Sequence, residues 1–202
     1  MNACLIGKDH CLTIFGGVYE TGALVFPDQA RVLEIGYAES DWMTPMLEER
    51  PDLHLTGIDW RPPEERPGPV IHGDVLAHDF PDASFDVVVG ISSIEHVGLG
   101  HYDNDPLDAQ GDQHCMERVV RWLKPGGWVY LDVPFSMDGY RECGDEYRVY
   151  DWPAVHSRLL PWGVLTLQGV WFCDHDAVRT LRSAPISTPR GWCYAALFAT
   201  KD

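Results

Sequence analysis

Short apolar runs alternate with polar, glycine-rich or helix-like segments along most of the chain. Runs of this length that close at glycine or aspartate are typical of buried β-strands. The run from Phe85 to Ile91 (FDVVVGI) is strongly apolar. Together the runs predict five strands, at residues 31–35, 53–58, 70–72, 85–91 and 128–133.

Two of the intervening segments predict helices. Ser40 or Asp41 can cap a helix that continues to about Arg50. The second segment runs from Asp112 to Leu123, and Lys124-Pro125-Gly126-Gly127 ends it. Its apolar residues fall on one helical face: Met116, Val119, Val120 and Leu123.

The alternation of strands and helices predicts an α/β fold. We expect a Rossmann-like, doubly wound and mostly parallel sheet with helices on both faces. The last two apolar runs, 164–172 and 192–200, have no long helix between them and predict an antiparallel C-terminal strand pair. We find no repeat or linker and expect one domain over residues 1–202, with residues 1–28 as an N-terminal extension or a small hairpin around 13–19.

The composition is that of an ordinary globular protein, with 45% hydrophobic and 23% charged residues. No apolar run approaches the roughly 20 residues that a membrane span needs. Met1 to Lys8 lacks the features of a secretory signal, and the six cysteines form no C-x-x-C, so we expect a cytoplasmic protein with reduced thiols.

The charge narrows the choice of partners. There are 31 acidic against 15 basic residues, a formal net charge of −16. Such a surface repels phosphate backbones and anionic lipids, so we expect a small-molecule substrate and no nucleic-acid or membrane partner. A homodimer is compatible with the sequence.

Ligands of open α/β sheets bind outside the carboxyl ends of the strands. Gly36 permits a tight turn and the close approach of a ligand. Asp59 is placed to accept hydrogen bonds from ribose hydroxyls, Asp74 to accept from an exocyclic amine, and the backbone of Val75 to reach an adenine ring. The predicted cofactor-binding residues are Glu34, Gly36, Ala38, Asp59, Trp60, Asp74, Val75 and Ser92.

The motifs that contain or adjoin these residues resemble those of class I S-adenosylmethionine-dependent methyltransferases. The matching segments are Val32–Gly36, Gly57–Asp59, Gly73–Val75, Phe85–Val89 with Ile94–Val97, and Leu123–Gly127 (LKPGG). The resemblance implies S-adenosyl-L-methionine as cofactor and methyl transfer as the reaction (EC 2.1.1 class). The family's glycine loop departs here at Ala38 and Ser40, which are small enough to let the methionine end of the cofactor pass.

A narrower likeness is to a poorly characterised methyltransferase-like group. It rests on Ser92–Gly100 (SSIEHVGLG), Asp105–Asp108 (DPLD), Gly111-Asp112 and Arg148–Tyr150 (RVY), together with LKPGG. Such proteins are often associated with glycan or natural-product pathways. Together with the net charge and the acidic run from His101 to Asp112, this association leads us to expect methylation of an O or N atom of a small polar metabolite, sugar-like or amine-bearing.

His96 is the predicted catalytic residue, because it follows the fourth strand and imidazole titrates near neutral pH, as a general base requires. Polar loops on either side of the site supply the predicted substrate-binding residues: His101, Tyr102, Asp103, Asp108, Arg148 and Tyr150. Metal-dependent relatives use E-x-x-E-H, and here Ser92 stands at the first position, so we expect no metal.

Two other functions remain open from the sequence. A nicotinamide-dependent oxidoreductase would need G-x-G-x-x-G, where this chain has Gly36, Ala38 and Asp41. A non-catalytic S-adenosylmethionine-binding sensor or subunit is favoured by the altered glycine loop, whereas His96 and the long polar loops favour an enzyme.

Overall fold

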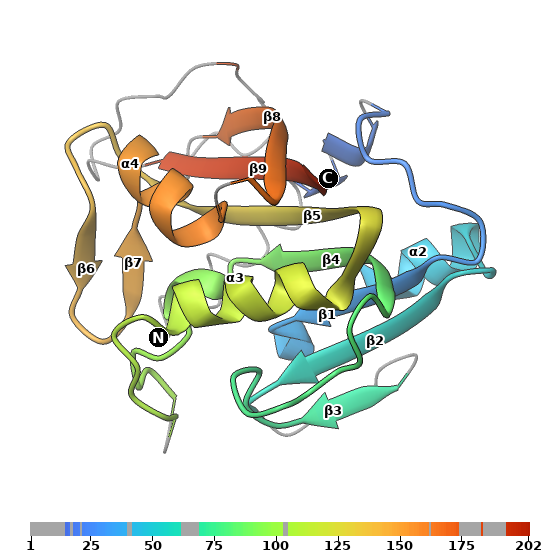
Figure 1. The fold of residues 1–202 in the computed structure, drawn as a ribbon, viewed down its shortest axis with the longest axis horizontal. Helices are drawn as coiled ribbons and strands as arrows, with labels where there is room; N and C mark the ends of the chain where they lie inside the picture. The colour runs from blue at the N-terminus through green and yellow to red at the C-terminus, as the bar shows by residue number, and fades with distance from the viewer. Residues whose placement is uncertain are drawn as a thin grey trace.

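The computed structural model describes residues 15–16, 18–20, 22–39, 42–61, 69–102, 105–161, 163–173, 183 and 193–202. A seven-stranded sheet in the order β3-β2-β1-β4-β5-β9-β8 forms its centre (Figure 1). Its strands are β1 Arg31–Ile35, β2 His54–Asp59, β3 Val70–His72, β4 Phe85–Ile91, β5 Leu123–Phe135, β8 Leu165–Cys173 and β9 Cys193–Lys201.

The pairing confirms the predicted fold class. Strands β3, β2, β1, β4 and β5 are mutually parallel, and β9 pairs antiparallel with both β5 and β8. The chain builds the sheet outward from β1 through β2 to β3 and then returns to add β4 beside β1. The strand order therefore reverses between β1 and β4, and a crevice opens at such a switch point in doubly wound sheets.

Helices cover both faces of this sheet (Figure 1). Because side chains alternate along a strand, Val32 of β1 joins one hydrophobic cluster and Leu33 the other. Helix α3, Gly111–Trp122, buries Met116 and Val119 in the cluster that contains Leu33. Helix α2, Met43–Glu49, lies with the opposite cluster. Alternating burial on two faces thus explains the near-continuous apolar strands.

The predicted N-terminal hairpin is wrong within the described residues. Phe15, Val18 and Tyr19 are helical, and residues 13 and 14 lie outside the described part. Phe15 and Val18 are three positions apart and both are buried, a helical spacing. The Phe15 ring packs 5.0 Å from the rings of Trp42 and Tyr130, so this turn of helix covers one face of the sheet.

Helix boundaries also differ slightly from the predictions. Helix α2 begins at Met43, and the proposed caps Ser40 and Asp41 lie outside the described residues. Helix α3 ends at Trp122, and Leu123 already belongs to β5, which pairs with Phe85 before a register shift. The described part of the chain contains no helix that is long and apolar enough to span a membrane.

A short hairpin and two helical turns follow β5. Strands β6 (Arg141–Cys143) and β7 (Tyr147–Val149) pair antiparallel, and α4 (Trp152–Ala154) continues into η3 (Val155–Leu159). Figure 1 shows the hairpin at the end of the sheet toward which β3 and β4 point. The hairpin therefore stands at the edge where ligands of such sheets bind.

Candidate functional site

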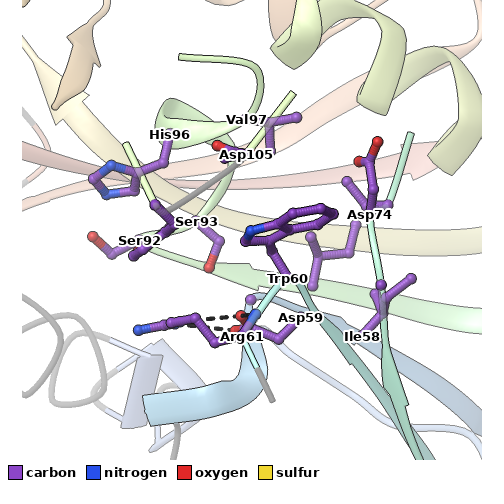
Figure 2. Close-up of a pocket in the computed structure, with 15 residues that line it drawn as sticks. Ile58, Asp59, Trp60, Arg61, Asp74, Ser92, Ser93, His96, Val97 and Asp105 are labelled. Carbon is purple, nitrogen blue, oxygen red and sulfur yellow. Dashed lines mark hydrogen bonds and ion pairs between the residues drawn. The ribbon is translucent and has the colours of Figure 1, made fainter. Parts of the chain in front are cut away.

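A pocket opens at the carboxyl ends of β1 to β4 (Figure 2). It contains about 670 Å³ of space outside the protein atoms, part of which is open solvent. The residues that line it are Ile35, Gly36, Ile58, Asp59, Trp60, Arg61, Gly73, Asp74, Val75, Ser92, Ser93, His96, Val97, Tyr102 and Asp105.

Gly36 lies directly after β1 in a left-handed backbone conformation with φ of +76°. Its N–H donates to the carbonyl of Ile58 at 2.8 Å. A Cβ atom at this position would lie 2.2 Å from Oγ and 2.5 Å from Cβ of Ser93. The glycine therefore lets the β1 turn approach the β4 turn, so that both line one pocket.

Asp59 ends β2 with a nearly buried carboxylate that accepts four hydrogen bonds. The donors are the N–H of Ala38 at 2.9 Å, the N–H of Arg61 at 2.8 Å, and Nε and Nη2 of Arg61 at 3.1 and 3.0 Å. Burial alone would raise the pKa of the Asp59 carboxyl. The Arg61 guanidinium and the two backbone donors outweigh burial and hold the pKa below its ordinary value, so the group stays ionised.

A second and a third carboxylate line the pocket on the side of β3. Asp74 follows β3 and accepts the N–H of Leu76 at 2.8 Å, which fixes the turn that carries Val75. Asp105 enters the pocket from the loop after β4 (Figure 2). Burial, followed by the negative charge of Asp74, raises the pKa of Asp105. This part of the pocket therefore favours groups that donate hydrogen bonds.

Ser92 turns the chain after β4 with φ of +43°, which is uncommon for a residue with a side chain. Its N–H donates to Oδ1 of Asp132 on β5 at 2.9 Å, and its hydroxyl donates to Oε1 of Glu95 at 2.8 Å. Backbone strain of this kind is often found at functional sites. Here the two hydrogen bonds hold the turn that leads into the segment Ile94–His96.

His96 ends that segment, a 3-10 helix labelled η2, and its side chain is 11% exposed. Its Nδ1 contacts the backbone carbonyl of Glu146, in the turn of the β6–β7 hairpin. A carbonyl only accepts, so Nδ1 donates and Nε2 of the neutral ring carries the lone pair. Nε2 lies 3.8 Å from Oε1 of Glu95, and the ring stacks on His101 with 5.2 Å between centroids.

The structure brings most of the predicted cofactor residues together. Six line the pocket: Gly36, Asp59, Trp60, Asp74, Val75 and Ser92. Ala38 reaches the pocket indirectly, through its hydrogen bond to Asp59. Glu34 is completely buried in β1 and does not belong to the lining.

The predicted substrate residues are more scattered. Tyr102 lines the pocket with the Arg61 guanidinium 4.7 Å from its ring centroid, and His101 packs beside it. Asp103 lies outside the described residues. Asp108 pairs with His114 at 2.6 Å, away from the lining, while Arg148 and Tyr150 are completely buried.

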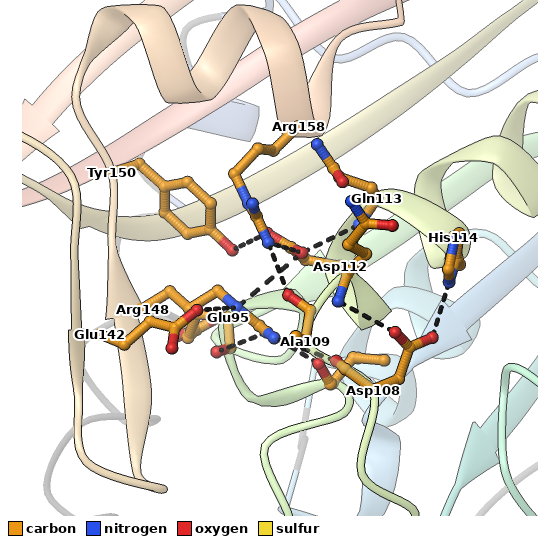
Figure 3. A network of polar contacts seen from close by, with 12 residues as sticks. Glu95, Asp108, Ala109, Asp112, Gln113, His114, Glu142, Arg148, Tyr150 and Arg158 are labelled. Atoms are coloured by element: carbon orange, nitrogen blue, oxygen red, sulfur yellow. Dashed lines mark hydrogen bonds and ion pairs between the residues drawn. The ribbon is translucent and has the colours of Figure 1, made fainter.

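Arg148 and Tyr150 belong to a buried polar network around Asp112 (Figure 3). Asp112, at the start of α3, accepts from the Tyr150 hydroxyl at 3.0 Å and from Nε and Nη2 of Arg158 at 2.7 Å each. Nε of Arg148 lies 3.8 Å from the same carboxylate. Burial, then the negative charge of Asp112, raises the pKa of Tyr150 well above its ordinary value. The network joins α3, β7 and η3 beside the pocket.

The sequence analysis missed three lining residues with polar or charged side chains: Arg61, Ser93 and Asp105. A basic residue two positions after the strand-end aspartate is a usable signal for Arg61. Ser93 can be recognised as a lining residue only from its close approach to Gly36, and that approach is known only once the fold is known. Asp105 belongs to the Asp105–Asp108 motif, but whether its side chain points into the pocket depends on the loop conformation.

Residues 75–151 match a protein family described as "Caenorhabditis protein of unknown function, DUF268". The matched segment contains β4, α3 and the β6–β7 hairpin, which is less than half of the chain. It includes every member of the buried network named above except Arg158. No curated protein matches the chain.

Many solved structures share the fold. The Burkholderia thailandensis 1,6-didemethyltoxoflavin-N1-methyltransferase, solved with 1,6-didemethyltoxoflavin and S-adenosylhomocysteine, has a TM-score of 0.65 and 18% identity over 96% of this chain and 79% of its own. A putative sarcosine dimethylglycine methyltransferase from Galdieria sulphuraria has a TM-score of 0.62 and 12% identity over 93% and 83%. The chain has the class I methyltransferase fold.

This fold does not by itself determine the reaction. The [4+2]-cyclase SpnF has a TM-score of 0.64 and 14% identity over 95% of this chain and 80% of its own. The reaction therefore depends on the side chains of the pocket. The class I methyltransferase fold accounts for the meeting of four strand ends there, and the particular side chains decide what they bind.

Proposed function

We propose that the protein is an S-adenosylmethionine-dependent methyltransferase that acts on an O or N atom of a small polar metabolite. One observation carries the proposal. A single pocket gathers Gly36, three strand-end or loop carboxylates and His96 around the switch point of the sheet. Groups suited to bind a nucleotide thus stand beside a candidate proton acceptor.

The pocket residues fit the cofactor. Gly36 lets the β1 turn approach Ser93, where a Cβ would clash, and both residues line the pocket. The ionised Asp59 carboxylate suits ribose hydroxyls, although Arg61 already donates to both of its oxygens and must share them or move aside. Asp74 suits an exocyclic amine, and Val75 offers apolar contact. When bound, S-adenosylmethionine supplies an electrophilic methyl group on a sulfonium.

His96 is suited to take a proton from the acceptor. The Glu146 carbonyl fixes the proton of the neutral ring on Nδ1, which leaves Nε2 able to accept. Glu95 is 1% exposed and lies close enough to stabilise the imidazolium that forms. General-base catalysis by a positioned imidazole needs this combination of an unprotonated ring nitrogen and a nearby carboxyl group.

The charges in the pocket support a small, polar substrate. The described lining has three carboxylates, Asp59, Asp74 and Asp105, against one guanidinium, Arg61. Carboxylates accept hydrogen bonds from hydroxyl and ammonium groups, and the Tyr102 ring offers flat apolar surface. The net charge of −16 opposes a nucleic-acid substrate.

A non-catalytic S-adenosylmethionine-binding sensor or subunit is the second candidate. The altered glycine loop at Ala38 and Ser40 favours it, and the [4+2]-cyclase among the fold neighbours is an example of this fold with a function other than methyl transfer. A chain in the solved complex between the Haloferax volcanii Trm112 methyltransferase activator and a putative methyltransferase also shares this fold. Binding of S-adenosylhomocysteine without methylation across a panel of sugar-like and amine-bearing acceptors would favour this candidate.

Replacing Asp59 with alanine should weaken binding of S-adenosylhomocysteine by about 1.5–3 kcal/mol, the range for hydrogen bonds to a charged group. Isothermal titration calorimetry measures the change. Asp86→Ala is the matched control: Asp86 also accepts from a cation, Lys124 at 2.8 Å, and a backbone N–H, but at the amino end of β4. An unchanged dissociation constant in folded Asp59→Ala protein would remove Asp59 from the site.

Methylation should not depend on a metal ion. Ser92 replaces the first carboxylate of E-x-x-E-H, and its hydroxyl donates to Glu95. Among the described residues, no group of three or more His, Cys, Asp or Glu side chains is arranged to hold a metal. Turnover measured in EDTA should match turnover in untreated enzyme. Loss of turnover that magnesium or zinc restores would contradict the prediction.

A further inference from the structure

The β6–β7 hairpin contacts the His96 ring and the backbone on either side of His96. From the turn of the hairpin, the Glu146 carbonyl accepts a hydrogen bond from the imidazole Nδ1. Two residues later, Arg148 donates through Nη1 to the carbonyls of Val97 at 2.7 Å and Glu95 at 3.4 Å. Glu95 and Val97 are the two chain neighbours of His96, so the ring and its backbone are held by the same hairpin.

Arg148 also ties down the far end of the loop that follows His96. Its Nη2 lies 3.4 Å from the carbonyl of Asp108, close to where that loop meets α3. A backbone hydrogen bond closes the same loop, because the Asp108 N–H donates to the Gly98 carbonyl at 2.8 Å. One guanidinium therefore spans both ends of the loop that carries Tyr102 and Asp105.

The buried charge of Arg148 is balanced rather than directed at a ligand. Its side chain is 0% exposed, and its Nε lies 3.8 Å from Asp112 and 3.7 Å from Glu142. Asp112 in turn is fixed by Arg158 and Tyr150 (Figure 3). A buried charge needs such partners, and here they anchor the guanidinium in one place.

We infer that Arg148 is a positioning residue: together with the Glu146 carbonyl it holds His96 as the Nδ1–H tautomer with Nε2 turned to accept a proton. A neutral imidazole carries one N–H, so a fixed acceptor at Nδ1 determines which nitrogen is bare. The inference rests on the proposed function in one respect: the proton that Nε2 takes comes from the methyl acceptor.

Arginine suits this task better than lysine. Its planar guanidinium presents several N–H donors in a rigid fork, which can reach carbonyls on both sides of His96 and the loop end at once. A lysine ammonium would keep the charge opposite Asp112 but would hold fewer of these carbonyls. Arg148→Lys should therefore preserve part of the positioning, and Arg148→Met should remove it.

The test measures the tautomer directly, with ¹⁵N-labelled histidine and long-range ¹H–¹⁵N correlation of the intact protein. His96→Gln assigns the His96 signals among the nine histidines by difference. In the wild-type protein the neutral ring should show a protonated Nδ1 and a bare Nε2. Arg148→Met should shift both signals toward a mixture of tautomers, and Arg148→Lys should give an intermediate shift.

Arg118→Met is the matched control, because Arg118 also donates to a backbone carbonyl, that of His78 at 3.1 Å, but not beside His96. It should leave the His96 signals unchanged. A wild-type ring protonated on Nε2 overturns the inference even if Arg148→Met fails to fold. Unchanged signals in folded Arg148→Met overturn it as well. S-adenosylhomocysteine is titrated separately: if the wild-type protein does not bind it, the proposed function fails and the tautomer result still stands.

Discussion

Gly36→Ala should reduce the affinity for S-adenosylhomocysteine by about 100-fold or more, equal to about 2.8 kcal/mol. The added Cβ would lie 2.2 Å from Ser93 Oγ, closer than any unstrained contact. Ser93 cannot simply rotate away, because its own Cβ is also only 2.5 Å from the new atom. The β1 and β4 turns must therefore separate, and both line the pocket. Calorimetry measures the binding, and urea unfolding measures the stability.

Gly126→Ala is the control that separates the clash with Ser93 from the cost of the left-handed backbone conformation. Gly126 has the same φ of +76°, but a Cβ there would meet no atom within 4 Å. It lies near the start of β5, at the end of the sheet opposite the pocket. Both variants should lose about 1–2 kcal/mol of stability from the left-handed conformation, and Gly36→Ala should lose more because of the clash with Ser93. Only Gly36→Ala should lose binding, and wild-type affinity in that variant would show that the β1 turn does not contact the ligand.

The sequence predicts the sheet well because its signals are local. Each parallel strand is buried on both faces, so it reads as a continuous apolar run such as FDVVVGI, and its bounds are confirmed by the structure. The carboxyl ends of such strands meet at one edge. Gly36, Asp59 and Asp74 could therefore be assigned to one site without knowledge of any contact between them.

Features that depend on distant contacts were not predicted. The described helical turn that contains Phe15 and Val18 is too short to show a clear period, and its burial depends on Trp42 and Tyr130. Arginine is seldom fully buried, so nothing in the sequence indicates the burial of Arg148. Its main partner, the Val97 carbonyl, lies 51 positions away in the chain. Backbone acceptors carry no sequence signature, and only the fold reveals them.

Replacing His96 with alanine should lower turnover about 10²–10⁴-fold, the usual contribution of a general base, once an acceptor is identified. The Nδ1 contact with Glu146 leaves Nε2 as the only ring nitrogen that can take the proton. Binding of S-adenosylhomocysteine should stay nearly unchanged, because the expected ribose and adenine contacts come from Asp59, Asp74 and Val75. Steady-state kinetics and calorimetry on the same preparations separate the two effects.

Two further variants make the His96 result specific. His54→Ala removes an exposed histidine at the amino end of β2 and should leave turnover unchanged. His96→Gln keeps a polar side chain of similar size but cannot accept and release a proton near neutral pH, so it should be as slow as His96→Ala. If His96→Gln instead turned over at the wild-type rate, His96 would serve only to pack the loop after β4. The proton acceptor would then have to be sought elsewhere in the pocket, first at Asp105, whose raised pKa brings that carboxylate closer to the range of a base.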